Sequence, residues 1–171
     1  MSLSYVKSHK SCYGCMFWRQ VLDYIIRPAR QEDWKALVDC VEAAYSKYIE
    51  RIGTKPAPML ADYMALIVQR KVWLLLVENE VRGVLVMMPE GESLFVENIA
   101  VDPRYQGQGF GHVLMAFVEQ QAREAQLKEI SLYTNVLMTE NLSFYRKLGF
   151  QEEGRYLHSG YQRVFFRKHL T

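Results

Sequence analysis

This sequence has few cysteines, a small net charge and no long apolar run. It has three cysteines, and the pair Cys12 and Cys15 has no second ligand pair at the spacing of a zinc site. Its surroundings also lack the strand-to-helix pattern of a redox pair. With 21 basic and 19 acidic residues, the net charge of +2 gives no reason to expect nucleic-acid binding. No apolar run approaches membrane-spanning length, and no signal peptide is evident. We therefore expect a cytoplasmic protein without a metal, nucleic-acid or membrane partner.

Repeats, linkers and low-complexity segments are absent too, so nothing divides the chain into two domains. The chain has 171 residues, of which 50% are hydrophobic, and this suffices for one domain with a sizeable core. Strand-like patterning begins at Tyr24. We therefore expect an N-terminal extension without a catalytic role over residues 1–22 and a single domain over residues 23–171.

The stretch from residue 97 to residue 111 is the most informative part of the chain. An apolar run ends at Asp102-Pro103, three alternating glycines follow at 107, 109 and 111, and apolar residues at helical spacing begin at Phe110. A strand, a glycine loop and a helix N-terminus together can hold a phosphate, because backbone N–H groups converge where no Cβ intervenes. The spacing differs from the dinucleotide fingerprint and from the P-loop. A tight turn with close helix packing is the alternative interpretation.

Strand-like runs and helical spacing alternate along the rest of the chain. Short connections link three apolar runs between residues 72 and 101, which predicts an antiparallel meander. Residues 130–134 form a strand that is reached through a helix, so they should lie parallel to the strand before the glycine loop. The expected strands are 24–27, 72–77, 81–88, 94–101, 130–134, 150–157 and 162–169, and the expected helices are 34–48, 60–68, 110–126 and 139–148.

Two motifs resemble those of the GNAT superfamily of N-acetyltransferases. Val101-Asp102-Pro103 followed by Gln106-Gly107-Gln108-Gly109-Phe110-Gly111 is similar to its acetyl-CoA signature, Gln/Arg-x-x-Gly-x-Gly/Ala. The stretch from Asn141 to Phe150 resembles a second hallmark at the right distance. The resemblance covers roughly Tyr24 to the C-terminus. It implies an α+β protein with the GNAT (acyl-CoA N-acyltransferase) fold, with a mixed central sheet of about seven strands flanked by about four helices, in the order β-α-α-β-β-β-α-β-α-β-β.

The resemblance also implies acetyl-CoA as cosubstrate and assigns its contacts. Backbone groups of strand 94–101 would pair with the pantetheine arm like an added strand, and N–H groups of the glycine loop would hold the pyrophosphate. Lys147 would either approach the 3′-phosphate or be a solvated lysine. The implied cofactor-binding residues are Ile99, Ala100, Val101, Gln106, Gly107, Gln108, Gly109, Phe110, Gly111, His112, Asn141 and Tyr145.

Acetyl transfer to an amine needs positioning, a base for the more basic amines and an acid for the departing thiolate. Tyr145 aligns with the tyrosine that often serves as the general acid in this superfamily, although it could simply be a core aromatic on a short helix. Glu97 stands in an apolar strand, at a place where several GNAT enzymes have a base that acts through water. It could instead face solvent, or bind the amine without taking its proton.

The acceptor site is the part that the sequence defines least. In GNAT proteins the segment between the first two helices and the last hairpin commonly frame the acceptor groove, and here these are residues 48–53 and 161–163. The candidates are Tyr48, Glu50, Arg51 and Arg163. Glu50 could receive a cationic amine, and Arg51 or Arg163 a substrate carboxylate, but each could equally be a surface charge.

We therefore expect an enzyme that moves the acetyl group of acetyl-CoA to a primary amine. Direct attack in a ternary complex is favoured, because no cysteine lies in either motif to accept the acetyl group. The acceptor would be a small amine or an amino-acid derivative, with a protein or peptide N-terminus or lysine as the alternative. An acyl-CoA-binding regulatory module without turnover and, more distantly, a nucleotide-binding module of another fold also stay open. The protein would be a monomer or a homodimer.

Overall fold

The computed structural model describes residues 5–6 and 23–170 of the chain. One mixed sheet has the strand order β1-β2-β3-β4-β5-β6-β8-β7. Its strands are β1 (Tyr5–Val6), β2 (Tyr24–Pro28), β3 (Val72–Val77), β4 (Glu80–Glu90), β5 (Ser93–Val101), β6 (Glu129–Asn135), β7 (Gln151–His158) and β8 (Tyr161–His169). The seven predicted strands are all present. The short β1, within the expected extension, adds an eighth by pairing antiparallel with β2. Cys12 and Cys15 lie outside the described residues.

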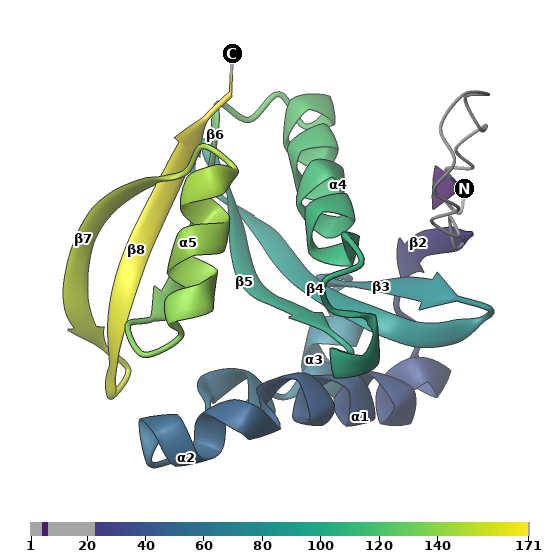
Figure 1. Cartoon of the computed structure of the whole chain (residues 1–171). Coiled ribbons are helices and arrows are strands. Elements are labelled where there is room, and N and C mark those ends of the chain that lie inside the picture. The colour runs from purple at the N-terminus through teal and green to yellow at the C-terminus, as the bar shows by residue number, and fades with distance from the viewer. Residues whose placement is uncertain (1–4, 7–22, 171) are drawn as a thin grey trace, which may run out of the picture.

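Helices cover both faces of the sheet (Figure 1). The helices are α1 (Trp34–Tyr45), α2 (Ile49–Ile52), α3 (Tyr63–Val68), α4 (Phe110–Glu124) and α5 (Thr139–Lys147). The first predicted helix ends as a 3-10 turn over Ser46–Tyr48, and α2 follows in a segment that was expected to connect two helices. One core lies between the sheet and α1 and α3, and includes Leu37 and Leu74. The other lies between the sheet and α4 and α5, and includes Leu114 and Phe166. The predicted α+β architecture and order of elements are confirmed.

A bulge in β5 changes which residues face each core. The register with β4 passes from Met87 opposite Val96 to Val86 opposite Asn98, so Glu97 is the extra residue. Before the bulge, Val96 belongs to the core under α4 and α5. After it, Ala100 belongs to the core under α1 and α3, although both positions are even-numbered. One inserted residue reverses the alternation of a strand, which brings Asn98 to the α1 face.

The strands β5 and β6 pair for only part of their length. Their parallel register covers Ser93–Val96 and Glu129–Leu132, as the sequence predicted for this connection. Beyond it, residues 98–101 pair in the described sheet with β4 alone, and residues 133–135 with β8 alone. The two strands therefore part immediately after Val96. Each leaves a backbone edge to which no described strand is paired.

Asp102 closes β5 and fixes the start of the glycine loop. Its carboxylate is 4% exposed and accepts hydrogen bonds from Arg104 Nη2 at 2.7 Å and from Arg82 Nη1 at 3.2 Å. It also accepts from the backbone N–H of Arg104 at 3.0 Å, in the 3-10 turn Pro103–Tyr105 that leads into the loop. The side-chain hydrogen bonds from Arg104 hold the pKa of Asp102 below its ordinary value, against the opposing effect of burial.

Replacing Asp102 with asparagine should lower the free energy of unfolding at pH 7 by about 2 kcal/mol, because hydrogen bonds to a charged, buried group are lost. The pKa of Asp102 is lower in the folded chain than in the unfolded chain, where it is about 3.9. Its stabilising effect is therefore complete above about pH 4 and is lost as the pH falls through the folded-state pKa. In urea unfolding, the difference in the free energy of unfolding between wild type and Asp102→Asn should be smaller at pH 3 than at pH 7.

Asp39→Asn is the control, because Asp39 forms an exposed pair with Lys35 at 2.9 Å and should change the unfolding curve little. A gap for Asp102→Asn that stayed constant between the two pH values would contradict the role given to its charge.

Candidate active site

The glycine loop lies between β5 and α4, and two of its glycines are required by backbone conformation. Gly107 has φ +75° and Gly109, the N-cap of α4, has φ +94°. A Cβ atom built at either position would have no heavy atom within 4 Å, so packing does not explain these glycines. Gly111 differs, because its Cβ would lie 3.2 Å from Phe144 Cζ of α5. The stretch therefore combines close helix packing at 111 with an exposed loop that ends at a helix N-terminus, and such a loop can bind an anion.

Side chains around the loop hold it against β5. Gln106 Nε2 donates to the carbonyl oxygen of Val101 at 2.9 Å, and Lys47 Nζ donates to Gln106 Oε1 at 3.3 Å. Gln108 Nε2 donates to the carbonyl oxygen of Arg104 at 3.0 Å. His112 is exposed in the first turn of α4, with its ring 5.1 Å from that of Phe144. Of the predicted pyrophosphate-binding residues, Gln106 to Gly109 and His112 are thus exposed at the end of β5, whereas Phe110 is buried in the core.

The second motif forms α5, beside the point where β6 ends. Asn141 Nδ2 donates to Thr134 Oγ1 at 3.2 Å, which ties the first turn of α5 to β6. Tyr145 is 4% exposed, and its ring lies 5.9 Å from Phe150 and 5.8 Å from Phe166. Burial raises the pKa of Tyr145 above its ordinary value, and the nearby Tyr48 hydroxyl raises it further. The ring is therefore part of the core, and its hydroxyl stays protonated at neutral pH. Lys147 is exposed at the end of this helix.

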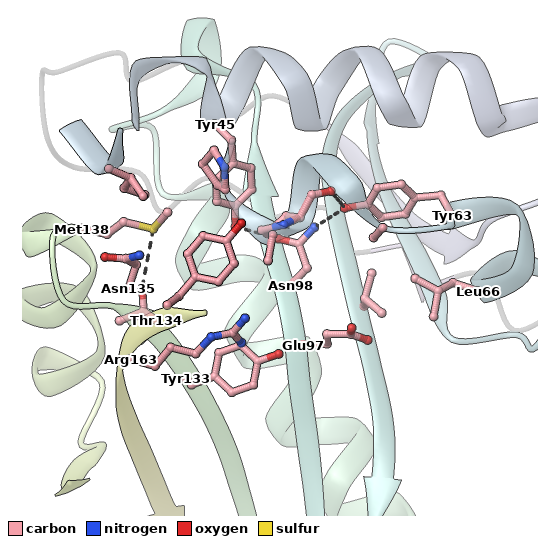
Figure 2. A pocket seen from close by; sticks show the side chains of 17 residues that line it. Tyr45, Tyr63, Leu66, Glu97, Asn98, Tyr133, Thr134, Asn135, Met138 and Arg163 are labelled. Carbon is pink, nitrogen blue, oxygen red and sulfur yellow. Dashed lines mark hydrogen bonds between the residues drawn. The ribbon is translucent and has the colours of Figure 1, made fainter. Parts of the chain in front are cut away.

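A cavity of about 650 Å³, partly open to solvent, begins where β5 and β6 part (Figure 2). The separating strands contribute Glu97 and Asn98 from β5 and Tyr133 to Asn135 from β6. The segment between α2 and α3 contributes apolar residues, among them Pro56 and Ala61, and β8 contributes Tyr161 and Arg163. Of the two segments that were expected to frame an acceptor groove, residues 161–163 contribute Tyr161 and Arg163 to the lining, and residues 48–53 contribute Ile52. The segment between α2 and α3 is also joined to β8 directly, because Tyr161 Oη donates to the carbonyl oxygen of Lys55 at 2.7 Å.

The four predicted acceptor-binding residues do not lie together. Tyr48, Glu50 and Arg51 do not line the cavity. Glu50 is exposed on α2, and the guanidinium of Arg51 is paired with Glu140 at 2.8 Å. Arg163 does line the cavity and is 4% exposed, with its guanidinium carbon 3.9 Å from the centre of the Tyr133 ring. A buried arginine in contact with an aromatic ring is unlike the surface charge that its sequence context also allowed.

A family profile settles what kind of protein has this arrangement. The profile described as the acetyltransferase (GNAT) family matches residues 34–150, which is more than half of the chain. The chain belongs to the acetyltransferase (GNAT) family. No curated protein sequence matches the chain.

Solved structures with low sequence identity share the GNAT fold. The PaiA N-acetyltransferase of Thermoplasma acidophilum, solved in complex with coenzyme A, is 16% identical, with a TM-score of 0.73 over 86% of this chain and 99% of that one. A GNAT-family acetyltransferase of Listeria monocytogenes is 16% identical, with a TM-score of 0.69 over 88% and 97%. The ribosomal-protein-S18-alanine N-acetyltransferase of Escherichia coli is 15% identical, with a TM-score of 0.66 over 85% and 93%. The predicted fold and family are thereby confirmed.

Several residues of this GNAT domain's cavity were not predicted as site residues. Tyr45 Oη donates to Asn98 Oδ1 at 2.7 Å, and Asn98 Nδ2 donates to Tyr63 Oη at 2.9 Å. Tyr63 Oη in turn donates to the carbonyl oxygen of Pro58 at 2.8 Å. This series of hydrogen bonds ties α1, α3 and the segment before α3 to β5, so it sets the shape of the cavity (Figure 2). Both tyrosines occur at helical spacing and were interpreted as core residues, and an asparagine within an apolar strand was the one available signal.

In the part of the chain that the structure describes, no helix combines the length and apolar character needed to cross a bilayer. Within residues 5–6 and 23–170, no three His, Cys, Asp or Glu side chains group in a way that could hold a metal ion.

Proposed function

We propose that this protein is an acetyl-CoA-dependent N-acetyltransferase that acetylates a primary amine, with a small amine or amino-acid derivative as the acceptor. The observation that carries the proposal is the position of the cavity. It opens between β5 and β6 directly after their last paired residues, and β5 then continues into the glycine loop at the N-terminus of α4. One strand thus connects a candidate acceptor cavity to a candidate phosphate site. The coenzyme A in the Thermoplasma acidophilum PaiA structure supports the same cosubstrate here.

The residues present fit an acyl-CoA. Backbone N–H groups of the glycine loop would hold the pyrophosphate, and no side chain stands where a Cβ of Gly107 or Gly109 would project. Ile99 to Val101 have a backbone edge without a strand partner in the described sheet, to which the pantetheine arm would pair. Asn141 would contact the same arm. When bound, acetyl-CoA supplies a thioester carbon that an amine can attack.

The proposed chemistry is direct transfer. The amine nitrogen forms a bond to the acetyl carbon while the bond from that carbon to sulfur breaks. Glu97, which lines the cavity, takes the proton that the amine loses, through a water molecule. Tyr145 donates its hydroxyl proton to the departing sulfur. Acetylation of Cys40, the cysteine that the structure describes, is not favoured, because Cys40 is buried in α1 and burial raises the pKa of its thiol to about 12.

The test is release of the coenzyme A thiol from acetyl-CoA at pH 7, with and without an amine, in wild type and Glu97→Gln. An alkylamine with a pKa near 10.4 is neutral in only about 1 of 2,500 molecules, whereas an amino-acid amide with a pKa near 8 is neutral in about 10%. A base therefore matters most for the alkylamine. We therefore expect Glu97→Gln to lower kcat/KM at least about tenfold with the alkylamine and less than about threefold with the amide.

Glu124→Gln is the matched control, because Glu124 lies at the far end of α4 and does not line the cavity. Equal losses with both amines in Glu97→Gln would contradict the role of base and would indicate amine binding alone. Tight acetyl-CoA binding without thiol release on any amine or peptide would favour the regulatory module over the enzyme.

A further inference from the structure

Among the described residues that line the cavity, Arg163 is the one basic residue, and it is held there by the sheet. It lies in β8, opposite Asn135 of β6 and Tyr156 of β7, so strands flank it on both sides. The side chain is 4% exposed and enters the cavity between two aromatic rings. Its guanidinium carbon is 3.9 Å from the Tyr133 ring centre and 5.5 Å from that of Tyr161. Figure 2 shows the Tyr133 ring against the guanidinium.

The guanidinium of Arg163 has no anionic partner among the described residues. No described carboxylate forms an ion pair with it, and its Nη1 atom is buried without a hydrogen-bond partner. The other shielded arginines of the described chain are paired. Arg27 pairs with Asp33 at 2.7 Å, and Arg82 pairs with Asp102 at 3.2 Å. Burying a cation without a partner is costly, and the contact with Tyr133 offsets only part of that cost. The unpaired nitrogen therefore points to an anion that is bound by the cavity.

The rest of the lining limits what that anion belongs to. Glu97 is the one acidic residue among the lining residues, as Arg163 is the one basic residue. Most of the other lining side chains are apolar or aromatic, including Ile52, Leu66 and Met138. The cavity thus offers a carboxylate for a cationic amine, a planar guanidinium fork for a carboxylate, and an apolar wall.

We infer that the acceptor is an α-amino acid, or a close derivative, with a free carboxylate and an apolar side chain, and that Arg163 binds that carboxylate. The inference rests on the proposed function, because the amine must be placed for acetyl transfer. It pairs Glu97 with the amino group and Arg163 with the carboxylate of one small molecule. A peptide N-terminus, in which the adjacent carboxylate is replaced by an amide, lacks the group that Arg163 would bind.

The experiment compares three acceptors in the thiol-release assay: leucine, leucinamide and isopentylamine. Leucinamide keeps the side chain but removes the negative charge, and isopentylamine removes the carboxyl group altogether. We expect wild-type kcat/KM to be at least about tenfold higher for leucine than for either analogue, since a charged hydrogen-bonded contact is lost. In Arg163→Gln the ratio of leucine to leucinamide should fall at least about tenfold below the wild-type ratio, a comparison in which the different amine pKa values of the two acceptors cancel. Arg163→Lys, which keeps the charge without the fork, should retain only part of the ratio.

Arg155→Gln is the control, because Arg155 is in the neighbouring strand β7 and pairs with Glu152 outside the cavity. It should keep the wild-type ratio. Thiol release with leucinamide equal to that with leucine in wild type would overturn the inference and leave the proposed function standing, whether or not Arg163→Gln folds. A leucine preference that persisted in folded Arg163→Gln would overturn the role of Arg163. Absence of release with every amine would overturn the proposed function, and this inference with it.

Discussion

Gly109→Val should abolish measurable acetyl-CoA binding, raising the Kd more than about 100-fold in a calorimetric titration. Gly109 has φ +94°, a conformation that a β-branched residue rarely adopts. A valine would therefore distort the loop that begins α4. Its side chain would also project into the space above the N–H groups, which nothing in the described chain fills within 4 Å of the Cβ position. Losing two or more hydrogen bonds to a charged phosphate, each contributing about 1.5–3 kcal/mol, accounts for the size of the effect.

Gly91→Val separates strain from loss of the site. Gly91 also has positive φ, +62°, and no heavy atom within 4 Å of its Cβ position, but it lies in the turn between β4 and β5. We expect this variant to unfold at lower urea concentration than wild type and to bind acetyl-CoA with an unchanged Kd. A folded Gly109→Val protein with the wild-type Kd would show that the phosphate site has been misplaced.

The arrangement of strands and helices could be predicted because it depends on local patterns. Apolar residues at helical spacing marked α1 and α4, and the short connection at Pro89 to Gly91 marked the turn from β4 to β5. The parallel pairing of β5 with β6 followed from the helix between them. The bulge at Glu97 could not be read this way, because the strand is apolar at both even and odd positions on either side of Glu97 and Asn98, so no alternation shows that the faces change. It depends on the register between two strands, which the sequence of one strand does not contain.

The candidate site was predictable where a motif is continuous and poorly predictable where it is assembled from distant segments. Gly107 and Gly109 both lie in the loop in which they were expected, although their role in cofactor binding stays a prediction. The acceptor side depends on how the segment around α2 lies relative to β8 of the sheet. Arg51 and Arg163 were equivalent in the sequence, as basic residues in the two segments that were expected to frame the acceptor groove. In the structure Arg51 is paired with Glu140 outside the cavity, whereas Arg163 is buried within it. Only burial and pairing distinguish them.

Tyr145→Phe should lower kcat about 100-fold or more while the Kd for acetyl-CoA stays within about twofold of wild type, because removal of a general acid affects the transition state alone. The ring would keep its contacts with Phe150 and Phe166, since only the hydroxyl is removed. Stability should therefore change little. Thiol-release kinetics at saturating amine and a calorimetric titration of each protein would measure the two quantities.

Tyr156→Phe controls for the loss of a hydroxyl, because Tyr156 is 58% exposed on β7 and lies outside both sequence motifs. The pH profile adds a second criterion. Burial raises the pKa of Tyr145, so its hydroxyl remains protonated, and able to donate, across an assay range of pH 6 to 9. Ionisation of Tyr145 should therefore not lower wild-type kcat toward pH 9. Any decrease of kcat in that range should also be present in Tyr145→Phe. An unchanged kcat in Tyr145→Phe would mean that the departing thiolate is protonated by solvent. Tyr145 would then be a core aromatic without a role in the chemistry.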